Sequence, residues 1–282
     1  MKYLSWKEEN ILTPESRLPS EKVITDMYAQ GFVFTRIGKG VMQQTRAVRI
    51  DLAAFEMSSE NRRIVRKIGA KIPPETNYLK TDSISKIHKN LVNFNDVVEK
   101  ENEASIPSVI STISPLPLAP ADYHWSMAKV AKDFYEKKFG PGVMSAVKVK
   151  ELLTDATKSN FNTLFSFALK KETGGNNGSG SASGITPIGA AICYKNSSLL
   201  HYSYPFYDLS NAAVPKDVGL GMMILAIEHA KNAGLRYIYL GSLQRPSDTY
   251  KLQFKGLEWF DGGPEGTDTW QTDIEKVKTI LK

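Results

Sequence analysis

Apolar residues recur along the chain with two different spacings, and each spacing predicts a different kind of element. Apolar side chains three or four positions apart predict helices, while runs of β-branched and aromatic residues between turn signals predict strands. Ser20 and Ser58 stand where an N-cap would stand, before two of the helical segments. The predicted helices are 20–30, 58–67, 82–101, 123–139 and 216–233, and the predicted strands are 31–40, 41–52, 147–153, 163–169, 188–194, 199–207 and 235–241.

A Pro- and Ser-rich stretch divides the chain into two predicted parts. Residues 104–120 include the run PLPLAP and are expected to form an extended connector, because proline favours extended backbone. We therefore predict an N-terminal α/β region over 1–103 and a second domain over 121–282. The low-complexity run TGGNNGSGSASG at 173–184 is interpreted as a loop, since its glycines do not match a phosphate-binding GxxxxGK[ST] motif.

The composition is that of a globular chain with a small positive charge. Of the 282 residues, 41% are hydrophobic and 23% are charged, and 36 Lys and Arg against 30 Asp and Glu give a formal net charge of +6. This balance permits a polyanionic partner without requiring one. The single cysteine, Cys193, excludes an intramolecular disulfide and a Cys-rich metal site, and it fits a reducing, cytoplasmic location.

Membrane insertion and metal binding are not expected from the sequence. No apolar run approaches the roughly 20 residues that a membrane-spanning helix needs. Residues 1–10 lack the apolar stretch of a secretory signal. The histidines are not at helical spacing from one another, so no locally built metal site is predicted. They are His88, His124, His201 and His229.

The segment KDVGLG, at Lys216–Gly221, offers candidate chemistry because it precedes a predicted helix. Unpaired backbone N–H groups near Gly219 would suit a phosphate or a developing oxyanion. The segment resembles the RxxGxG/A loop with which GNAT acyltransferases bind the pyrophosphate of coenzyme A, with Lys216 in place of the arginine. The resemblance implies a GNAT-like mixed α/β sheet in the second domain. A helix that begins with glycine for close packing remains the alternative interpretation.

A longer series of motifs resembles a second family. In order along the chain stand FYD at 206–208, GLG at 219–221, YIYLG at 237–241, KLQFKG at 251–256 and Trp270. The series resembles the C-terminal domain of the aminoacyl-tRNA–protein transferases, the arginyl- and leucyl-transferases of the N-degron pathway. In that family the corresponding features look like Y-Y-D-P, S-L-G, a Y-Y/L-G strand end, K-M-x-Y-K-G and a late Trp.

The first half of the chain extends this resemblance. GF at 31–32 before Arg36, VRI at 48–50, the basic run at 58–67 and FGPGVM at 139–144 resemble the G-F-R, V-R-I, S-x-x-x-R-R-x-x-R-K and R-H-x-x-G-x-M segments of the family. The chain departs from the pattern in three ways. It has no cysteine over 41–45, where the family carries a cysteine group, so an iron–sulfur or metal function there is excluded. Leu209 replaces the proline, and Phe139 replaces the histidine.

The resemblance implies transfer of an amino acid from aminoacyl-tRNA to the N-terminal amine of a protein or peptide, with no cofactor beyond the tRNA co-substrate. Since the aminoacyl ester is already activated, such an enzyme positions the amine and stabilises the oxyanion without a nucleophilic triad. The candidate catalytic residues are Asp208, Tyr207 and Lys251. The candidate substrate- and tRNA-binding residues are Arg36, Arg62, Arg63, Lys67, Gly219, Leu220, Gly221 and Lys255.

Several interpretations stay open at this point. Asp208 either receives the proton of the attacking amine or caps a turn. Lys251 and Lys255 would share one face of a helix and contact phosphates, or are solvated, and alanine at either is expected to leave the melting temperature nearly unchanged. Tyr202, Tyr204 and Tyr207 either stack on the terminal adenine of tRNA or pack in the core. The alternative functions are an acyl-CoA-dependent N-acyltransferase and a non-catalytic binding protein.

Overall fold

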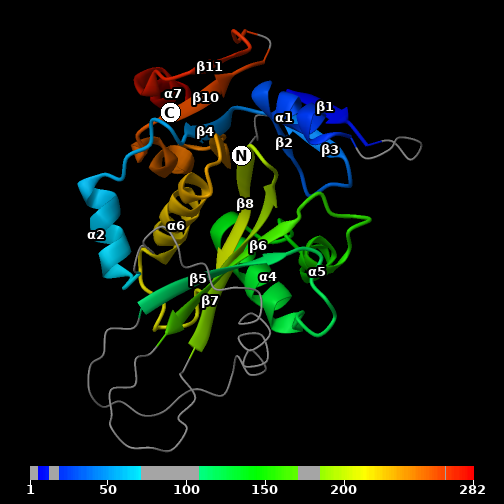
Figure 1. The fold of residues 1–282 in the computed structure, drawn as a ribbon, viewed down its shortest axis with the longest axis vertical. Coiled ribbons are helices and arrows are strands. Elements are labelled where there is room, and N and C mark those ends of the chain that lie inside the picture. Colours follow the sequence, from blue (N-terminus) through cyan, green and yellow to red (C-terminus); the bar gives the residue numbers. More distant parts are fainter. Residues whose placement is uncertain (1–5, 13–18, 71–107, 171–184, 264) are drawn as a thin grey trace, which may run out of the picture.

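The structure is a computed structural model that describes residues 6–12, 19–70, 108–170, 185–263 and 265–282. Its main feature is an eight-stranded sheet with the strand order β11-β10-β4-β9-β8-β7-β6-β5 (Figure 1). Neighbouring strands in this sheet are antiparallel, except that β8 and β9 run parallel. A smaller sheet has the order β1-β3-β2. The mixed α/β class that the sequence predicts is confirmed.

The bounds of the elements follow the sequence closely in most places. The strands of the large sheet are β4 (Ala47–Asp51), β5 (Ser108–Pro115), β6 (Thr163–Lys170), β7 (Ile185–Lys195), β8 (Leu199–Tyr207), β9 (Tyr237–Ser242), β10 (Leu257–Asp261) and β11 (Thr269–Gln271). The small sheet consists of β1 (Lys7–Asn10), β2 (Phe32–Phe34) and β3 (Val41–Gln44). The helices are α1 (Glu21–Ala29), α2 (Ser59–Lys67), α4 (Trp125–Phe139), α5 (Ala146–Thr154), α6 (Val218–Asn232), the 3-10 helix η3 (Pro246–Gln253) and α7 (Ile274–Ile280).

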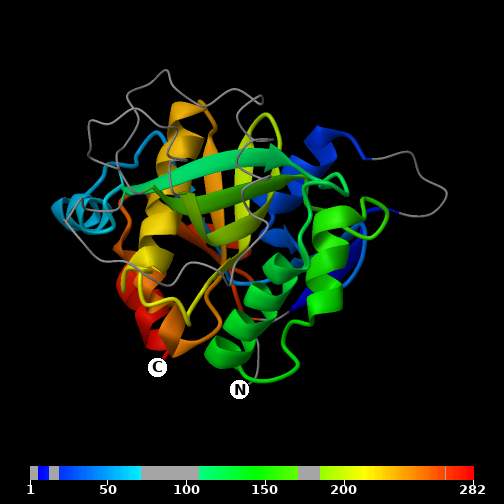
Figure 2. The same ribbon diagram turned by 90° about the horizontal axis from the view of Figure 1, so that it is seen from below.

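Each face of the large sheet is covered by its own set of helices and its own core (Figure 2). On one face the apolar residues of α2, α6 and α7 pack against the strands, and α6 is apolar nearly all round because it is buried on most sides. On the other face α1, the small sheet, α4 and α5 form a second core. The sheet is therefore the middle layer of three.

The second core contains a buried polar contact within a group of aromatic rings. The hydroxyl of Tyr28, in α1, lies 2.9 Å from Nδ1 of His201, in β8. The Tyr28 ring also packs edge-on against Tyr239 and Phe34, with centroids 4.8 and 5.8 Å away. This group fixes α1 to the centre of the sheet, since burial of Tyr28 and His201 is complete or nearly so.

Four of the predicted helices lie in the described residues and are confirmed as α1, α2, α4 and α6. Ser20 and Ser58 accept the N–H of the third following residue, as the N-cap prediction requires. The predicted strands 163–169, 188–194, 199–207 and 235–241 correspond to β6, β7, β8 and β9. The predicted helix at 82–101 and the loop at 173–184 lie outside the described residues.

Three expectations about local structure are wrong or incomplete. The predicted strand 147–153 is helix α5, because Ser145 caps it and Val149, Leu152 and Leu153 are buried at helical spacing. The segment 41–52 is not one strand but two, β3 and β4, which belong to different sheets. The expected connector 104–120 contains β5, whose β-branched residues pair with β6 over its whole length.

Strand β4 comes from the predicted N-terminal region but lies between β9 and β10 in the large sheet. The two predicted parts of the chain therefore share one sheet, and the boundary over 104–120 stays a prediction about chain organisation. In the described part of the chain, no helix is both long and apolar enough to cross a bilayer.

Candidate functional site

The candidate site lies where the parallel strands β8 and β9 separate. The two strands pair only from Leu199–His201 with Tyr237–Tyr239. Beyond this, β8 continues to Tyr207 and β9 to Ser242 with no further pair between them. Because parallel strands have their carboxyl ends at the same edge, the segments that follow both strands meet there, and such an edge is where open α/β sheets bind ligands.

Tyr207 connects the end of β8 with the first turn of α6. A Cβ atom added to Gly219 would lie 2.9 Å from Cε1 and 3.1 Å from the hydroxyl of Tyr207, so only glycine lets the ring approach this closely. On its other side the Tyr207 ring contacts Phe134 of α4, with centroids 4.8 Å apart. The predicted residues Tyr207 and Gly219 thus lie together, and the phenol hydroxyl is held at a helix N-terminus.

At the N-terminus of α6, two backbone N–H groups have no backbone carbonyl as a partner among the described residues. Val218 donates to Pro215 and Gly221 donates to Asp217, but neither Gly219 nor Leu220 donates to a backbone carbonyl. The side chain of the N-cap residue Asp217 makes no capping hydrogen bond. It pairs instead with Lys67 of α2, at 2.5 Å. This helix end can therefore offer N–H groups to an anionic atom.

Asp208, the residue after β8, has the geometry of a turn residue. Its Oδ1 accepts hydrogen bonds from the N–H of Ser210 at 2.8 Å, the hydroxyl of Ser210 at 2.6 Å and the N–H of Asn211 at 3.2 Å. These contacts are those of a residue that caps a turn, which is one of the two interpretations of Asp208; the other is a proton acceptor for the attacking amine. The Asp208 carboxylate holds the chain as it turns from β8 toward α6.

Lys251 is a buried cation at the end of β9. Its Nζ donates to the carbonyl oxygen of Ser242 at 2.8 Å and lies 3.6 Å from Oδ1 of Asp248. Burial lowers the pKa of Lys251, and the Asp248 carboxylate opposes that effect. Burial, with the Lys251 charge as a smaller cause, lowers the pKa of His201 to about 3. A positive charge therefore sits at the separating strands, shielded from water.

Lys251 and Lys255 do not share a helix face, contrary to the expectation drawn from their spacing. η3 ends at Gln253, and Lys255 follows it in the turn before β10. Lys255 is exposed and pairs with Glu56 at 2.6 Å. The Lys251 side chain is buried, so we now expect alanine at position 251 to lower the melting temperature rather than leave it nearly unchanged.

The predicted tRNA-binding residues of α2 form an exposed basic surface next to α6. Arg63 makes a bidentate contact with Glu60, at 2.7 and 2.6 Å, and Arg62 donates to the carbonyl of Met57 at 2.6 Å. The end of α2 packs closely on α6 at Gly221, since a Cβ at Gly221 would lie 2.3 Å from Cδ1 of Ile68, the C-cap residue of α2. Leu220 packs at the edge of the same core. The pairs Arg63–Glu60 and Lys67–Asp217 lie at the surface, where ion pairs contribute little to stability.

Arg36 is not part of this basic surface. Its guanidinium donates to the carbonyl of Val143 at 2.7 Å, in the turn between α4 and α5. It lies near Tyr204 on the other face of the sheet, where its charge opposes the effect of burial on the pKa of that tyrosine. Arg36 thus joins the segment after β2 to the α4–α5 hairpin.

Two of the three tyrosines considered for base stacking pack in the protein. Tyr202 is 2% exposed in the first core, and Tyr204 packs edge-on against Phe161 with centroids 5.3 Å apart. The Tyr202 hydroxyl is buried without a hydrogen-bond partner. A nucleobase cannot reach a ring buried in this way, which leaves the core interpretation for Tyr202.

The sequence analysis did not single out Arg245 or Tyr250 of the η3 segment, and it named Phe139 only as a departure from the family pattern. The guanidinium carbon of Arg245 lies 4.8 Å from the ring centroid of Phe139, the last residue of α4. Tyr250 of η3 is 45% exposed. A usable signal was present, since Arg245 and Tyr250 follow the carboxyl end of a strand in a parallel pair.

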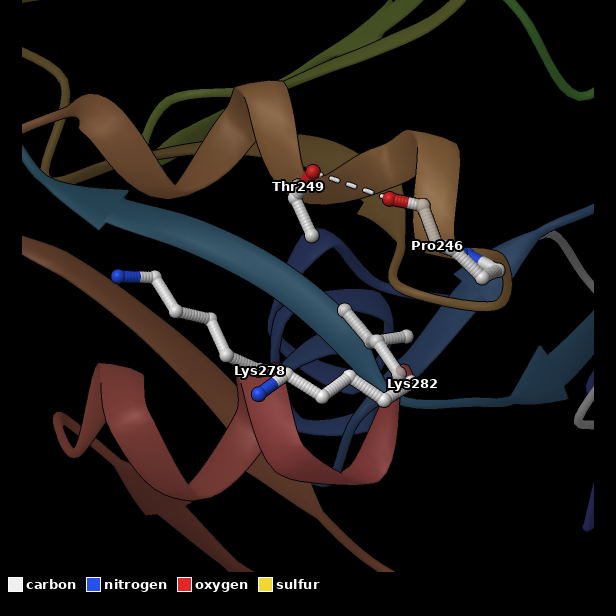
Figure 3. Close-up of a pocket in the computed structure, with 5 residues that line it drawn as sticks. Pro246, Thr249, Lys278 and Lys282 are labelled. Atoms are coloured by element: carbon white, nitrogen blue, oxygen red, sulfur yellow. Dashed lines mark hydrogen bonds between the residues drawn. The ribbon is translucent and has the colours of Figure 1, made fainter.

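A surface pocket lies beside this region but contains none of the predicted site residues (Figure 3). It is lined by Pro246 and Thr249 of η3 and by Lys278, Leu281 and Lys282 at the C-terminal end. Thr249 donates to the Pro246 carbonyl at 3.0 Å, and Lys278 pairs with Glu275. Across the described ranges, no three His, Cys, Asp or Glu residues are grouped as metal ligands would be.

Comparison with known proteins yields distant structural similarity alone. No protein-family model and no curated protein matches the chain. The structure of L-PGS from Bacillus licheniformis is similar with a TM-score of 0.35 and 10% identity, over 79% of this chain and 52% of that one. The C-terminal domain of a putative lysylphosphatidylglycerol synthetase from Agrobacterium fabrum gives 0.37 and 10%, over 82% and 54%. The chain spans about half the length of these two structures, and at these scores the similarity carries no argument about activity.

Proposed function

We propose that this protein transfers an aminoacyl group from aminoacyl-tRNA to the N-terminal amine of an acceptor protein or peptide. The observation that carries the proposal is the contact of Tyr207 with Gly219 at the point where β8 and β9 separate. Both residues belong to the collinear motifs that resemble the aminoacyl-tRNA–protein transferases. The contact places a phenol hydroxyl and a helix N-terminus at one point.

The reaction needs few chemical groups, because the ester of an aminoacyl-tRNA is already activated. The acceptor nitrogen bonds to the ester carbonyl carbon, the carbonyl oxygen becomes an oxyanion, and the bond to the ribose oxygen then breaks. The proton lost by the amine ends on the ribose oxygen. In the proposal the N–H groups of Gly219 and Leu220 and the hydroxyl of Tyr207 stabilise the oxyanion. Lys251 adds a buried positive charge at the carboxyl end of β9, where it contacts the Ser242 carbonyl.

The tRNA would lie over α2 and the start of α6 in this proposal. The basic side chains there are Arg62, Arg63 and Lys67, with Lys255 nearby through its pair with Glu56. Phosphate groups would exchange with Glu60, Asp217 and Glu56 as partners of these cations. Binding would then weaken steeply as the salt concentration rises, since counterions are released on binding.

The test is transfer of radiolabelled amino acids from a mixed pool of charged tRNA to peptides that begin with Asp, Glu, Arg or Ala. Label in one class of peptide would identify the donor and the acceptor together. Gly219→Ala would push the Tyr207 ring away and Tyr207→Phe would remove its hydroxyl, so we expect both to reduce transfer at least about tenfold. Lys278→Ala, on the exposed part of α7, is the matched control and is expected to keep full activity.

The other outcomes of this assay lead to different functions. Binding of charged tRNA without transfer to any peptide would contradict the enzyme and favour the non-catalytic binding protein. Absence of both, together with protection against thermal unfolding by acetyl-CoA, would favour the acyl-CoA-dependent N-acyltransferase. In that case the N–H groups of Gly219 and Leu220 would serve a pyrophosphate.

A further inference from the structure

Two large aromatic side chains, one at the end of α4 and one in η3, are half exposed, whereas most other rings near them are covered. Phe139, at the end of α4, is 41% exposed, and Tyr250, in η3, is 45% exposed. The neighbouring Phe134 and Tyr135 are each 7% exposed. An exposed aromatic ring that contacts an arginine from another element needs an explanation, since single exposed apolar residues are ordinary but clustered contacts mark interaction surfaces.

The Phe139 ring is held in place by its neighbours. Tyr135 lies one turn earlier in α4 with its centroid 5.5 Å away and its plane inclined by 35°. Phe134 contacts both Phe139, at 6.5 Å, and Tyr207, at 4.8 Å. Rings therefore run continuously from the Tyr207–Gly219 contact to the exposed face of Phe139.

Arg245 and Tyr250 complete this surface from η3. The Arg245 guanidinium carbon is 4.8 Å from the Phe139 centroid. Tyr250 lies five residues after Arg245, in the 3-10 helix that Arg245 caps. Figure 2 shows the C-terminal end of α4 beside the segment that contains η3. We call Phe139, Arg245 and Tyr250 the mouth platform.

Two basic side chains stand directly before Phe139 in the last turn of α4, where the neighbouring Glu136 is paired with Lys132. Lys137 and Lys138, in the last turn of α4, are exposed, and within the described residues neither forms an ion pair. Asp248, the acidic residue of η3, is occupied by the N–H groups of Gln244 and Arg245, at 2.9 and 3.0 Å, and lies near Lys251. The ligand that fits has a planar ring to stack and a negative charge beside it.

We propose that the mouth platform stacks an unpaired nucleobase at the single-stranded 3′ end of an RNA, with Lys137 and Lys138 against its phosphates. Bases of single-stranded RNA stack on aromatic rings and on guanidinium planes, and exposed lysines contact the backbone. This inference rests on the proposed tRNA donor. It replaces Tyr202, which is buried, with Phe139, which is accessible and connected to Tyr207 through Phe134.

Binding of uncharged RNA hairpins tests the platform separately from transfer. One probe carries a four-nucleotide 3′ overhang, the second carries the same overhang with an abasic terminal nucleotide, and the third is blunt. Wild-type protein is expected to bind the first probe about tenfold more tightly than the abasic one, because stacking on an aromatic ring contributes roughly that factor or more. Phe139→Ala is expected to bind the first two probes equally.

Two further variants separate stacking from folding. Phe139→Trp keeps a ring and is expected to restore the preference for the intact overhang. Trp125→Ala removes a 59% exposed ring at the other end of α4 and is expected to keep the wild-type preference. The binding assay uses uncharged RNA and does not depend on transfer. The preference for the intact overhang can therefore be present when transfer is absent, and the two proposals can fail independently.

Four results would overturn the inference. The wild-type protein could bind the intact and abasic overhangs equally, Phe139→Ala could retain the preference at an unchanged melting temperature, or no probe could bind at all. The last result would contradict the tRNA donor as well. Loss of the preference in Trp125→Ala to the same extent as in Phe139→Ala would assign it to a general effect on α4 and would equally reject the platform.

Discussion

At the scale of single residues, Lys251 shows how burial changes the meaning of a side chain. Its ammonium holds the Ser242 carbonyl at 2.8 Å and lies 3.6 Å from Asp248, and the residue is 7% exposed. Lys251→Ala leaves the carbonyl and the carboxylate without this partner. We expect a loss of ~2 kcal/mol in the free energy of unfolding, or roughly 4–8 °C in Tm. Calorimetry of the purified variant measures it.

Lys255→Ala is the matched control for this prediction. Lys255 lies four residues away and pairs with Glu56 at 2.6 Å, but both side chains are more than half exposed. Solvent screens such a pair, so its loss is expected to change Tm by less than about 2 °C. Equal Tm values for the two variants would contradict a structural role for the buried Lys251 ammonium.

The candidate site was only partly predictable at this scale. The motifs located Tyr207 and Gly219, which contact each other, because glycine beside a helix start and an aromatic strand end are visible in a sequence. Spacing alone paired Lys251 with Lys255, although one residue is buried and the other is exposed. Burial depends on what the rest of the chain places above a residue, and a four-residue spacing does not contain that information.

At the scale of elements, α2 and α6 approach each other most tightly at Gly221. A Cβ at position 221 would lie 2.3 Å from Cδ1 of Ile68, which is 1% exposed. Gly221→Ala is therefore expected to destabilise the protein by about 1–2 kcal/mol, because overpacking outweighs the gain in helix propensity. Ile68→Val removes the clashing methyl group and costs about 1 kcal/mol on its own.

The double variant Gly221→Ala/Ile68→Val is expected to be at least ~1 kcal/mol more stable than the sum of the two single effects. Urea unfolding of the four proteins in this cycle gives the coupling energy. Additive single effects would mean that the two helices are not in contact at this glycine. The basic surface of α2 would then no longer be fixed relative to the start of α6.

The elements were predictable where local pattern and tertiary environment agree. The serine caps and apolar spacing of α1 and α2 suffice to place these helices, and the aromatic run 199–207 is β8. Segment 147–153 failed because two valines resemble a strand, although Ser145 caps a helix there. Strand β5 was missed because the prolines that follow it favour an extended connector, and its β-branched residues alone do not reveal the partner strand β6.

At the scale of the whole molecule, the central sheet has a core on each side, and its middle strands are buried on both faces. No local pattern could predict that β4, from the first 60 residues, lies between β9 and β10. That placement is a long-range pairing. The helices and small sheet on the second face bury a histidine of β8: His201 is 1% exposed, and the hydroxyl of Tyr28 lies 2.9 Å from its Nδ1.

The buried histidine makes the stability of the whole molecule depend on pH. Burial lowers the pKa of His201 to about 3, and the Lys251 charge contributes, whereas in the unfolded chain the value is ~6.5. Burial also lowers the pKa of His229 to about 4. Between these values and pH 6.5 the unfolded state binds more protons than the folded state. The stabilising contribution is therefore complete above pH 6.5 and is lost as the pH falls, by ~1.4 kcal/mol per pH unit for each histidine.

Urea unfolding from pH 7.5 to 4.5 measures this slope, and two variants identify its source. His201→Gln keeps an oxygen that can accept from the Tyr28 hydroxyl but cannot titrate, so its free energy of unfolding is expected to fall less steeply than that of the wild type below pH 6.5. Tyr28→Phe removes the hydrogen bond of 2.9 Å and leaves the histidine, so it is expected to lower stability at every pH while keeping the wild-type slope. Parallel curves for wild type and His201→Gln would show that His201 is already open to water in the folded protein, and the two-sided core around β8 would have to be abandoned.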